Sequence, residues 1–278
     1  MTRLLRYRHD GLTFDVTDQG PLDGDPVVLL HGWPERASSW RGVVPHLHEA
    51  GLRTYAPDQR GYSKGARPER RRDYALQHLR DDAIALIETI GQPVHLVGHD
   101  WGGAIGWLVA AKRPDLVRSW VSASTPHTKA FALALLKTKQ GPASWYMGAF
   151  NVPGVPEWVA RTGRMDISLR KGGMTKEDVQ RVHDEIIDDG AMHYGLMYYR
   201  GIPFSTAAMR DEMVVRVPTT YVWSDKDVAC TDAGLAMTAR LVEAPYEQVT
   251  LQGVSHWIPT EAPDELAEHI LKRIASVS

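Results

Sequence analysis

Apolar residues fall into short runs along the chain, and these runs predict the strands of a buried sheet. Residues 26–32 are almost continuously apolar, which is typical of a strand covered on both faces of a parallel sheet. Near the N-terminus, residues 4–20 alternate in character around Asp10-Gly11, a dipeptide that favours a two-residue hairpin turn. Further strands are predicted at residues 53–61, 94–98, 117–124, 219–225 and 246–253.

Between these strands, apolar residues recur at helical spacing. In residues 75–91 the apolar positions from Leu79 to Ile90 lie along one side of a predicted helix, and Gly91 is placed as its C-cap. Strands that alternate with helices imply an α/β fold, in which a parallel sheet is covered on both faces. Further helices are predicted at residues 102–114, 231–243 and 263–276.

The alternation breaks between residues 128 and 213. This block is rich in helical and aromatic segments with scattered Pro and Gly, and the alternation resumes only with the predicted strand at residues 219–225. We therefore predict a core domain made of residues 1–127 and 214–278, with residues 128–213 inserted as a helical cap.

Composition and charge narrow the range of partners. The chain of 278 residues is 43% hydrophobic, and its net charge of −2 gives no electrostatic reason to expect a nucleic acid or an anionic membrane as partner. Cys230 is the single cysteine, so an intrachain disulfide is excluded. The first residues contain no apolar run of signal-peptide length, and no run approaches 18 apolar residues. We expect a cytoplasmic protein without a membrane span.

One strand-to-helix turn carries an exposed carboxylate. The sequence Gly98-His99-Asp100-Trp101-Gly102 has small residues two positions before and two after its apex, as a nucleophile elbow requires. The elbow leaves the side chain of Asp100 above the sheet, next to the N-terminal end of the following helix. The alternative is an ordinary turn in which Asp100 caps that helix.

Other chemically capable residues follow further strands. Asp225 and Asp227 come at the end of one predicted strand, and His256 lies in the loop after the next. Ligand sites in such sheets lie outside the carboxyl ends of the strands, so these side chains should converge on the crevice that holds Asp100. The order nucleophile, acid, histidine is the order used by this architecture.

The elbow, the stretch His31-Gly32-Trp33-Pro34, the sequence "DQRGYSKGARP" and the "SHW" around His256 together resemble the epoxide hydrolases of the α/β-hydrolase fold. The resemblance implies a mostly parallel eight-stranded sheet with helices on both faces and an inserted helical cap. It implies Asp100 as a nucleophile that forms an alkyl ester, and His256 as the base that activates water. The acid is Asp227, counted from Ser224, where the family often has Gly; Asp225 remains the rival.

The resemblance also assigns roles to residues around the nucleophile. Tyr146 and Tyr199 match the two tyrosines that assist ring opening, with Tyr198 as a substitute for the second. The backbone N–H groups of Trp33 and Trp101 would hold the oxyanion. The substrate-binding residues implied are Trp33, Trp101, Tyr146, Tyr199 and Phe150.

Two other functions remain open at this stage. An Asp nucleophile also suits haloalkane or haloacid dehalogenases, and the indole N–H of Trp101 could serve a halide. Trp33, however, stands where haloalkane dehalogenases commonly carry a halide-binding Asn. A binding protein that has lost catalysis is a third reading. We expect no cofactor and no metal, with a small epoxide and water as the only partners; a homodimer is left open.

Overall fold

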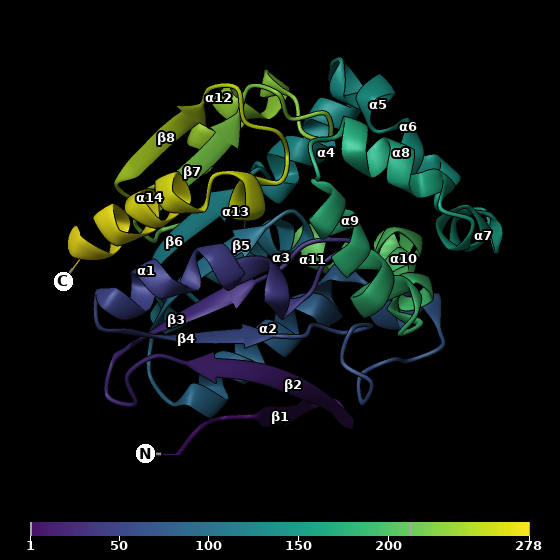
Figure 1. The fold of residues 1–278 in the computed structure, drawn as a ribbon. Coiled ribbons are helices and arrows are strands. Elements are labelled where there is room, and N and C mark those ends of the chain that lie inside the picture. Colours follow the sequence, from purple (N-terminus) through teal and green to yellow (C-terminus); the bar gives the residue numbers. More distant parts are fainter. Residues whose placement is uncertain (1, 212, 278) are drawn as a thin grey trace.

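The computed structural model describes residues 2–211 and 213–277 and contains one sheet of eight strands in the order β1-β2-β4-β3-β5-β6-β7-β8 (Figure 1). The pairs β1–β2 and β2–β4 are antiparallel, and the remaining pairs are parallel. The predicted mostly parallel eight-stranded sheet is therefore confirmed. The strands are β1 (Arg6–His9), β2 (Leu12–Gln19), β3 (Asp25–Leu30), β4 (Leu52–Pro57), β5 (Val94–His99), β6 (Val117–Ala123), β7 (Thr219–Ser224) and β8 (Tyr246–Leu251).

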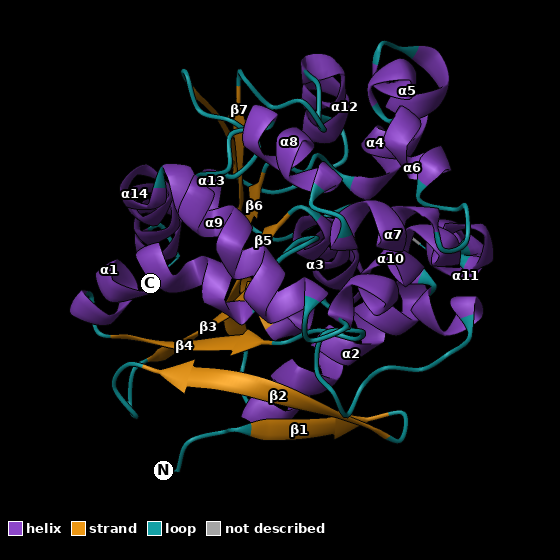
Figure 2. Cartoon of the chain, turned by 45° about the vertical axis from the view of Figure 1, so that its right-hand side comes forward, coloured by secondary structure: helices purple, strands orange, loops and turns teal. Residues whose placement is uncertain are grey.

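Helices cover both faces of the sheet, as Figure 2 shows for α1 and α14 on one side and α2 and α3 on the other. In β3, Val27 and Leu29 pack with α1 and α14, whereas Val28 and Leu30 pack with α2 and α3. Both faces are buried, which explains the unbroken apolar run. The α-helices are α1 (Val44–Glu49), α2 (Leu76–Ile90), α3 (Trp101–Lys112), α4 (Thr128–Lys137), α5 (Gln140–Ala143), α6 (Trp145–Ala149), α7 (Val155–Arg161), α8 (Arg164–Lys171), α9 (Lys176–Val182), α10 (Ala191–Gly201), α11 (Thr206–Arg210), α12 (Leu235–Ala239), α13 (Ile258–Glu261) and α14 (Pro263–Ala275).

The predicted hairpin at Asp10-Gly11 is confirmed, with φ of 49° and 74° at the two turn residues. The predicted helix at residues 231–243 is too long. A 3₁₀ turn (Asp232–Gly234) leads into α12, which ends at Ala239. The chain then becomes extended, because Val242 forms a parallel β-bridge with Val215.

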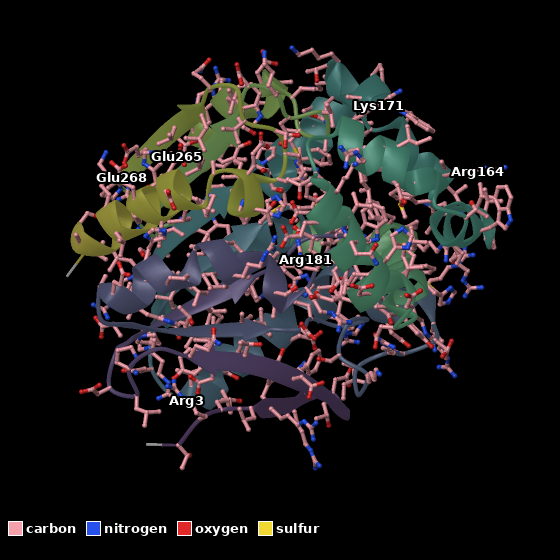
Figure 3. All side chains as sticks on the ribbon, in the orientation of Figure 1. Arg3, Arg164, Lys171, Arg181, Glu265 and Glu268 are labelled. Carbon is pink, nitrogen blue, oxygen red and sulfur yellow. The ribbon has the colours of Figure 1, made fainter. Side chains whose placement is uncertain are left out.

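Helices α4 to α11 lie between β6 and β7 and form the inserted segment (Thr128–Arg210), which lies beyond the carboxyl ends of the central strands (Figures 1 and 2). Ion pairs join it to the rest of the chain. Arg181 of α9, labelled in Figure 3, donates to Glu35 at 2.7 Å. Arg41 contacts Asp178 at 2.6 Å, also on α9. The inserted segment is thus held over the edge of the sheet where Asp100 emerges. In the described part of the chain, no helix is long and apolar enough to cross a membrane.

Candidate active site

Asp100 stands at the turn between β5 and α3 with a backbone that few non-glycine residues adopt, φ 50° and ψ −118°. The turn is possible because its neighbours are glycines. A Cβ added to Gly98 would lie 2.4 Å from the carbonyl oxygen of Gly102, and one added to Gly102 would lie 2.0 Å from that of Leu30. A Cβ on Gly32 would lie 2.5 Å from the Cβ of Asp100. The spacing of small residues therefore reflects contacts too close for any side chain.

The carboxylate of Asp100 points above the sheet and does not cap α3. Its Oδ1 accepts a hydrogen bond of 2.7 Å from the backbone N–H of Trp33. Trp101 is the first residue of α3, and the first N–H groups of a helix have no partner inside the helix. The N–H of Trp33, in the segment between β3 and α1, therefore binds the carboxylate, and the N–H of Trp101 begins the helix that follows it. The peptide bond between Trp33 and Pro34 is cis.

His256 lies between two carboxylates. Its Nε2 is 3.5 Å from Oδ2 of Asp100, and its Nδ1 donates to Oδ2 of Asp227 at 2.8 Å. The other oxygen of Asp227 accepts the backbone N–H groups of Ala229 and Cys230, at 2.7 and 2.8 Å. Asp227 is therefore held in one orientation, and it in turn orients the imidazole ring.

Asp225 is directed elsewhere. Its Oδ1 accepts the backbone N–H of Gly253 at 2.7 Å, and its Oδ2 lies 3.8 Å from the ammonium group of Lys226. Of the two acids that follow β7, the structure brings Asp227 to the histidine and directs Asp225 toward Gly253.

The two carboxylates decide the charge of the imidazole. Burial lowers the pKa of His256, but Asp227 and Asp100 outweigh it and raise the pKa to about 10. Burial raises the pKa of Asp100, yet the hydrogen bond and charge of His256 bring it below its usual value. At neutral pH the resting site therefore holds an imidazolium between two carboxylates.

Two tyrosines of the inserted segment lie close to Asp100. Tyr146 on α6 and Tyr199 on α10 have ring centroids 6.2 Å apart. Phe150 packs against both, and the ring of Tyr199 meets that of Trp101 edge-on at 5.1 Å. Burial, followed by nearby groups that include Asp100, raises the pKa of each tyrosine well above its usual value. Both hydroxyls therefore stay protonated and can donate.

Tyr198, the substitute for Tyr199, faces away from the carboxylate. It is almost fully buried, and its hydroxyl donates to the backbone carbonyl of Arg60 at 2.8 Å. Its ring packs against Tyr62 and Tyr74. These contacts make it a packing residue between α10 and the core.

Two cavities meet at Asp100. The smaller has a volume of about 290 Å³ and is bounded by α3, α4 and α10; the larger has about 420 Å³ and is bounded by α6, α7 and α8. Asp100, Tyr146 and Tyr199 line both cavities, and most of the remaining lining is apolar. Trp33, Phe150 and His256 line the larger one, and Trp101 lines the smaller. The site can therefore take an apolar molecule whose reactive centre lies in the middle.

Two histidines near Asp100 support the structure. Burial lowers the pKa of His31 to about 3, and its Nε2 accepts the backbone N–H of Gln59. Burial likewise lowers the pKa of His99 to about 4, and its Nε2 donates to the carbonyl of His256. Both rings are neutral at pH 7 and fix the loops that carry the reactive groups.

Two residues were not singled out for this site from the sequence. Glu35 is buried below the elbow, paired with Arg181 and 3.9 Å from Nδ1 of His99; its place directly after Pro34 was the available signal. Cys230 lines the smaller cavity and has its sulfur within 4.8 Å of ligand atoms of Asp227 and His256. This trio is a possible metal-ligand set in the described chain, but the Nδ1–Asp227 hydrogen bond already engages two of its members.

Comparison with known proteins agrees with this geometry. The sequence profile of the alpha/beta hydrolase fold matches residues 25–152. The AB hydrolase superfamily protein YfhM of Bacillus subtilis is 31% identical over 95% of this chain and 94% of its own length. The chain therefore belongs to the α/β-hydrolase superfamily.

Within that superfamily, the chain is similar to proteins named as epoxide hydrolases, so the resemblance drawn from the sequence is confirmed. Epoxide hydrolase 3 of Xenopus tropicalis is 29% identical over 94% of this chain and 74% of its own length. A solved structure described as a novel epoxide hydrolase from metagenomes of hot environments superimposes with a TM-score of 0.84. It is 28% identical, and the match covers 99% of both chains.

Proposed function

We propose that this chain hydrolyses an epoxide to a vicinal diol through an alkyl ester on Asp100. The observation that carries the proposal is a carboxylate that shares two apolar cavities with the side chains of Tyr146 and Tyr199. An opening epoxide needs a nucleophile at carbon and a proton donor for the departing oxygen. The activity named for the similar proteins supports the same conclusion.

In the first step, Oδ2 of Asp100 attacks a ring carbon; an O–C ester bond forms and one C–O bond of the ring breaks. Oδ1 remains on the N–H of Trp33, which leaves Oδ2 as the attacking atom. The ring oxygen takes a proton from Tyr146 or Tyr199, and His256, protonated at rest, returns a proton to that tyrosine. After this step the ester is neutral and the imidazole is free.

This proton transfer is supported by the electrostatics of the site. Asp100 is one of the charges that raise the pKa of His256, and esterification removes that charge. The pKa of His256 therefore falls once the ester has formed, and the imidazole becomes a base in the second step only. The hydrogen bond of Asp227 keeps Nε2 directed at the ester.

In the second step, Nε2 of His256 takes a proton from water while the water oxygen bonds to the ester carbonyl carbon. The N–H groups of Trp33 and Trp101 stabilise the oxyanion; one such donor contributes roughly 3 kcal/mol in comparable sites. The alkyl oxygen then leaves as the second diol hydroxyl. One proton of the water ends on the diol and the other restores the imidazolium.

In this mechanism, two parts of the chain supply different catalytic groups. Residues 1–127 and 214–278 form the core that supplies the nucleophile, the base and the acid, and residues 128–213 form a cap that supplies both tyrosines. Phe150 and the apolar lining of both cavities favour substrates with hydrocarbon on each side of the ring. Turnover rates on a panel of epoxides would identify the preferred substrate.

A single turnover in oxygen-18 water tests the proposal. Label should appear in the carboxylate of Asp100 after proteolysis and mass spectrometry, because water attacks the acyl carbon. Label found in the diol alone would mean direct attack by water and would refute the ester. A parallel panel of epoxides and haloalkanes separates the two leaving groups: the proposal requires diol formation, and halide release without diol would favour a dehalogenase.

A further inference from the structure

Large apolar side chains are exposed in an unusual concentration on the first half of the inserted segment. Trp145 on α6 is 73% exposed, and Trp158 on α7 is 53% exposed. Tryptophan is rarely left in water to this extent without a partner. Four other large apolar residues of α4 to α8 and the turn between α6 and α7 are also exposed: Leu136, Val152, Val155 and Ile167. These six residues come from neighbouring elements of the inserted segment (Figures 1 and 2), and we call them the apolar face.

The apolar face is continuous with the mouth of the larger cavity. Trp145 and Val155 belong to the face and also line that cavity. Val228, 60% exposed in the loop after β7, completes the rim. A molecule that reaches Asp100 through the larger cavity therefore passes between side chains that are themselves half or more exposed.

Basic residues lie on the same stretch of the chain as this face. From residue 128 to residue 171 the chain carries seven Lys or Arg and two acidic residues, whereas the whole chain has a net charge of −2. All seven basic residues are exposed, and Glu157 and Asp166 are paired with Arg200 and His183. Lys139 pairs with Asp232. The seven are Lys129, Lys137, Lys139, Arg161, Arg164, Arg170 and Lys171.

On α8 the two kinds of residue alternate along one side. Arg164, Ile167 and Lys171 follow each other at three- and four-residue intervals and are exposed, while Met165 and Leu169 face inward. The guanidinium of Arg164 also lies over the ring of Trp158, 4.5 Å from its centroid. Figure 3 shows Arg164 and Lys171 at the outer edge of the molecule.

Helix α14, on the side of the molecule away from Arg164, exposes three acidic side chains and one basic one, Lys272. Helix α14 exposes Asp264, Glu265 and Glu268, and Figure 3 shows Glu265 and Glu268 on the side away from Arg164. A negatively charged surface would therefore attract the inserted segment and repel α14, so the molecule would approach it in one orientation. The overall charge of −2 hides this asymmetry.

We propose that the apolar face and its basic border dock on the surface of an anionic phospholipid bilayer. Exposed Trp and aliphatic side chains flanked by Lys and Arg are the combination that binds such an interface. Two-fold pairing of this face with itself in a second copy fits less well, because two basic borders would face each other. Docking would place the larger cavity against the lipid bilayer, which dissolves apolar epoxides. This consequence rests on the proposed function, whereas the docking itself does not.

Vesicle co-sedimentation at low salt tests the proposal without any turnover. The probes are vesicles of phosphatidylcholine and vesicles of an equal mixture with phosphatidylglycerol. We expect binding to the mixed vesicles, loss of that binding at about 1 M salt, where the screening length is about 3 Å, and weak binding to neutral vesicles. Absence of binding to the mixed vesicles at low salt would overturn the proposal.

Paired variants locate the surface. Arg164→Glu/Lys171→Glu should lower the partition coefficient by about tenfold or more, because each basic residue near an anionic surface contributes a factor of about five. The matched control is Arg6→Glu/Arg8→Glu on β1, which makes the same change in charge far from the inserted segment (Figure 1). An equal loss in both variants would show attraction without a defined surface and would refute the docking.

Trp158→Ser/Ile167→Ser tests the apolar contribution. Neither residue lines either of the two cavities that meet at Asp100, so turnover of a small water-soluble epoxide should be retained. We expect weaker vesicle binding with an unchanged melting temperature. Light scattering of the wild-type protein should give the mass of one chain. A dimer that the same substitutions dissociate would assign the face to a second copy and overturn the proposal.

Discussion

Replacement of His256 by Gln separates the two chemical steps of the proposed reaction. Gln keeps a polar side chain of similar length but cannot act as a base. The carboxylate of Asp100 keeps its hydrogen bond from Trp33 but loses the charge and hydrogen bond of His256, which lower its pKa, so the first step should proceed at a reduced rate. Hydrolysis of the ester should then become rate-limiting, and the alkylated protein should accumulate.

The size of the effect follows from the geometry. Nε2 of His256 lies 3.5 Å from Oδ2 of Asp100, so its loss removes general-base catalysis of the second step. That form of catalysis contributes about 10² to 10⁴ in rate. From a typical turnover of ~10 s⁻¹, a 10⁴-fold loss leaves an ester with a half-life of about ten minutes. This lifetime is long enough for intact-protein mass spectrometry.

The assay is the mass of the variant within a minute of mixing with an epoxide that the wild type turns over. We expect an increase equal to the mass of the epoxide, followed by slow decay. His256→Gln combined with Asp100→Ala is the control and should gain no mass. An unmodified mass in the single variant, with the fold intact by circular dichroism, would show that Asp100 does not react with carbon.

Three further predictions concern the surroundings of the nucleophile. Conversion of Tyr146 and Tyr199 together to Phe should reduce epoxide turnover by about 10²-fold or more, since both proton donors are lost. Each single variant should keep part of the activity. Full activity in the double variant would show that the two tyrosines are packing residues. Asp227→Asn should lower turnover strongly, because the imidazole loses the charge that orients and stabilises it, whereas Asp225→Asn should have a small effect. Steady-state rates of the two variants test this, and a larger loss for Asp225→Asn would make Asp225 the acid. Folding raises the pKa of His256 from about 6.5 to about 10, so its ion pairs stabilise the fold fully below pH 6.5 and lose this contribution as the pH rises to 10. Chemical denaturation of wild type and His256→Gln across that range should show that their difference in unfolding free energy decreases with pH.

The sheet was predictable from the sequence because its strands are buried on both faces. Val27 to Leu30 have no polar interruption, and such a run cannot be accommodated at a surface. The short helix α1, six residues with Pro45 at its start, was not predicted, because its pattern is too brief to show a period. Helix α12 ends early for a non-local reason, the bridge between Val242 and Val215.

The reactive groups were predictable to different degrees. The elbow around Asp100 is a local constraint, and its glycine spacing is visible in the sequence. The choice of Asp227 over Asp225, two positions away, came from the family resemblance, by counting from Ser224. Residue types alone left the choice open, because it depends on which side of a loop faces the histidine. The approach of Tyr146 to Tyr199 joins residues more than fifty positions apart, so it follows from the packing of α6 against α10, which no local pattern encodes.

The unequal volumes on either side of Asp100 carry a stereochemical consequence. A ligand with one long arm and one short arm fits the space of about 420 Å³ with the former and that of about 290 Å³ with the latter, and the reverse orientation is crowded. Size alone would then determine which of two neighbouring carbon atoms is presented to the carboxylate. For the proposed substrates, the size of the two hydrocarbon groups would therefore determine the enantiomer of the diol that forms. Substitutions that enlarge the smaller cavity should lower this enantioselectivity.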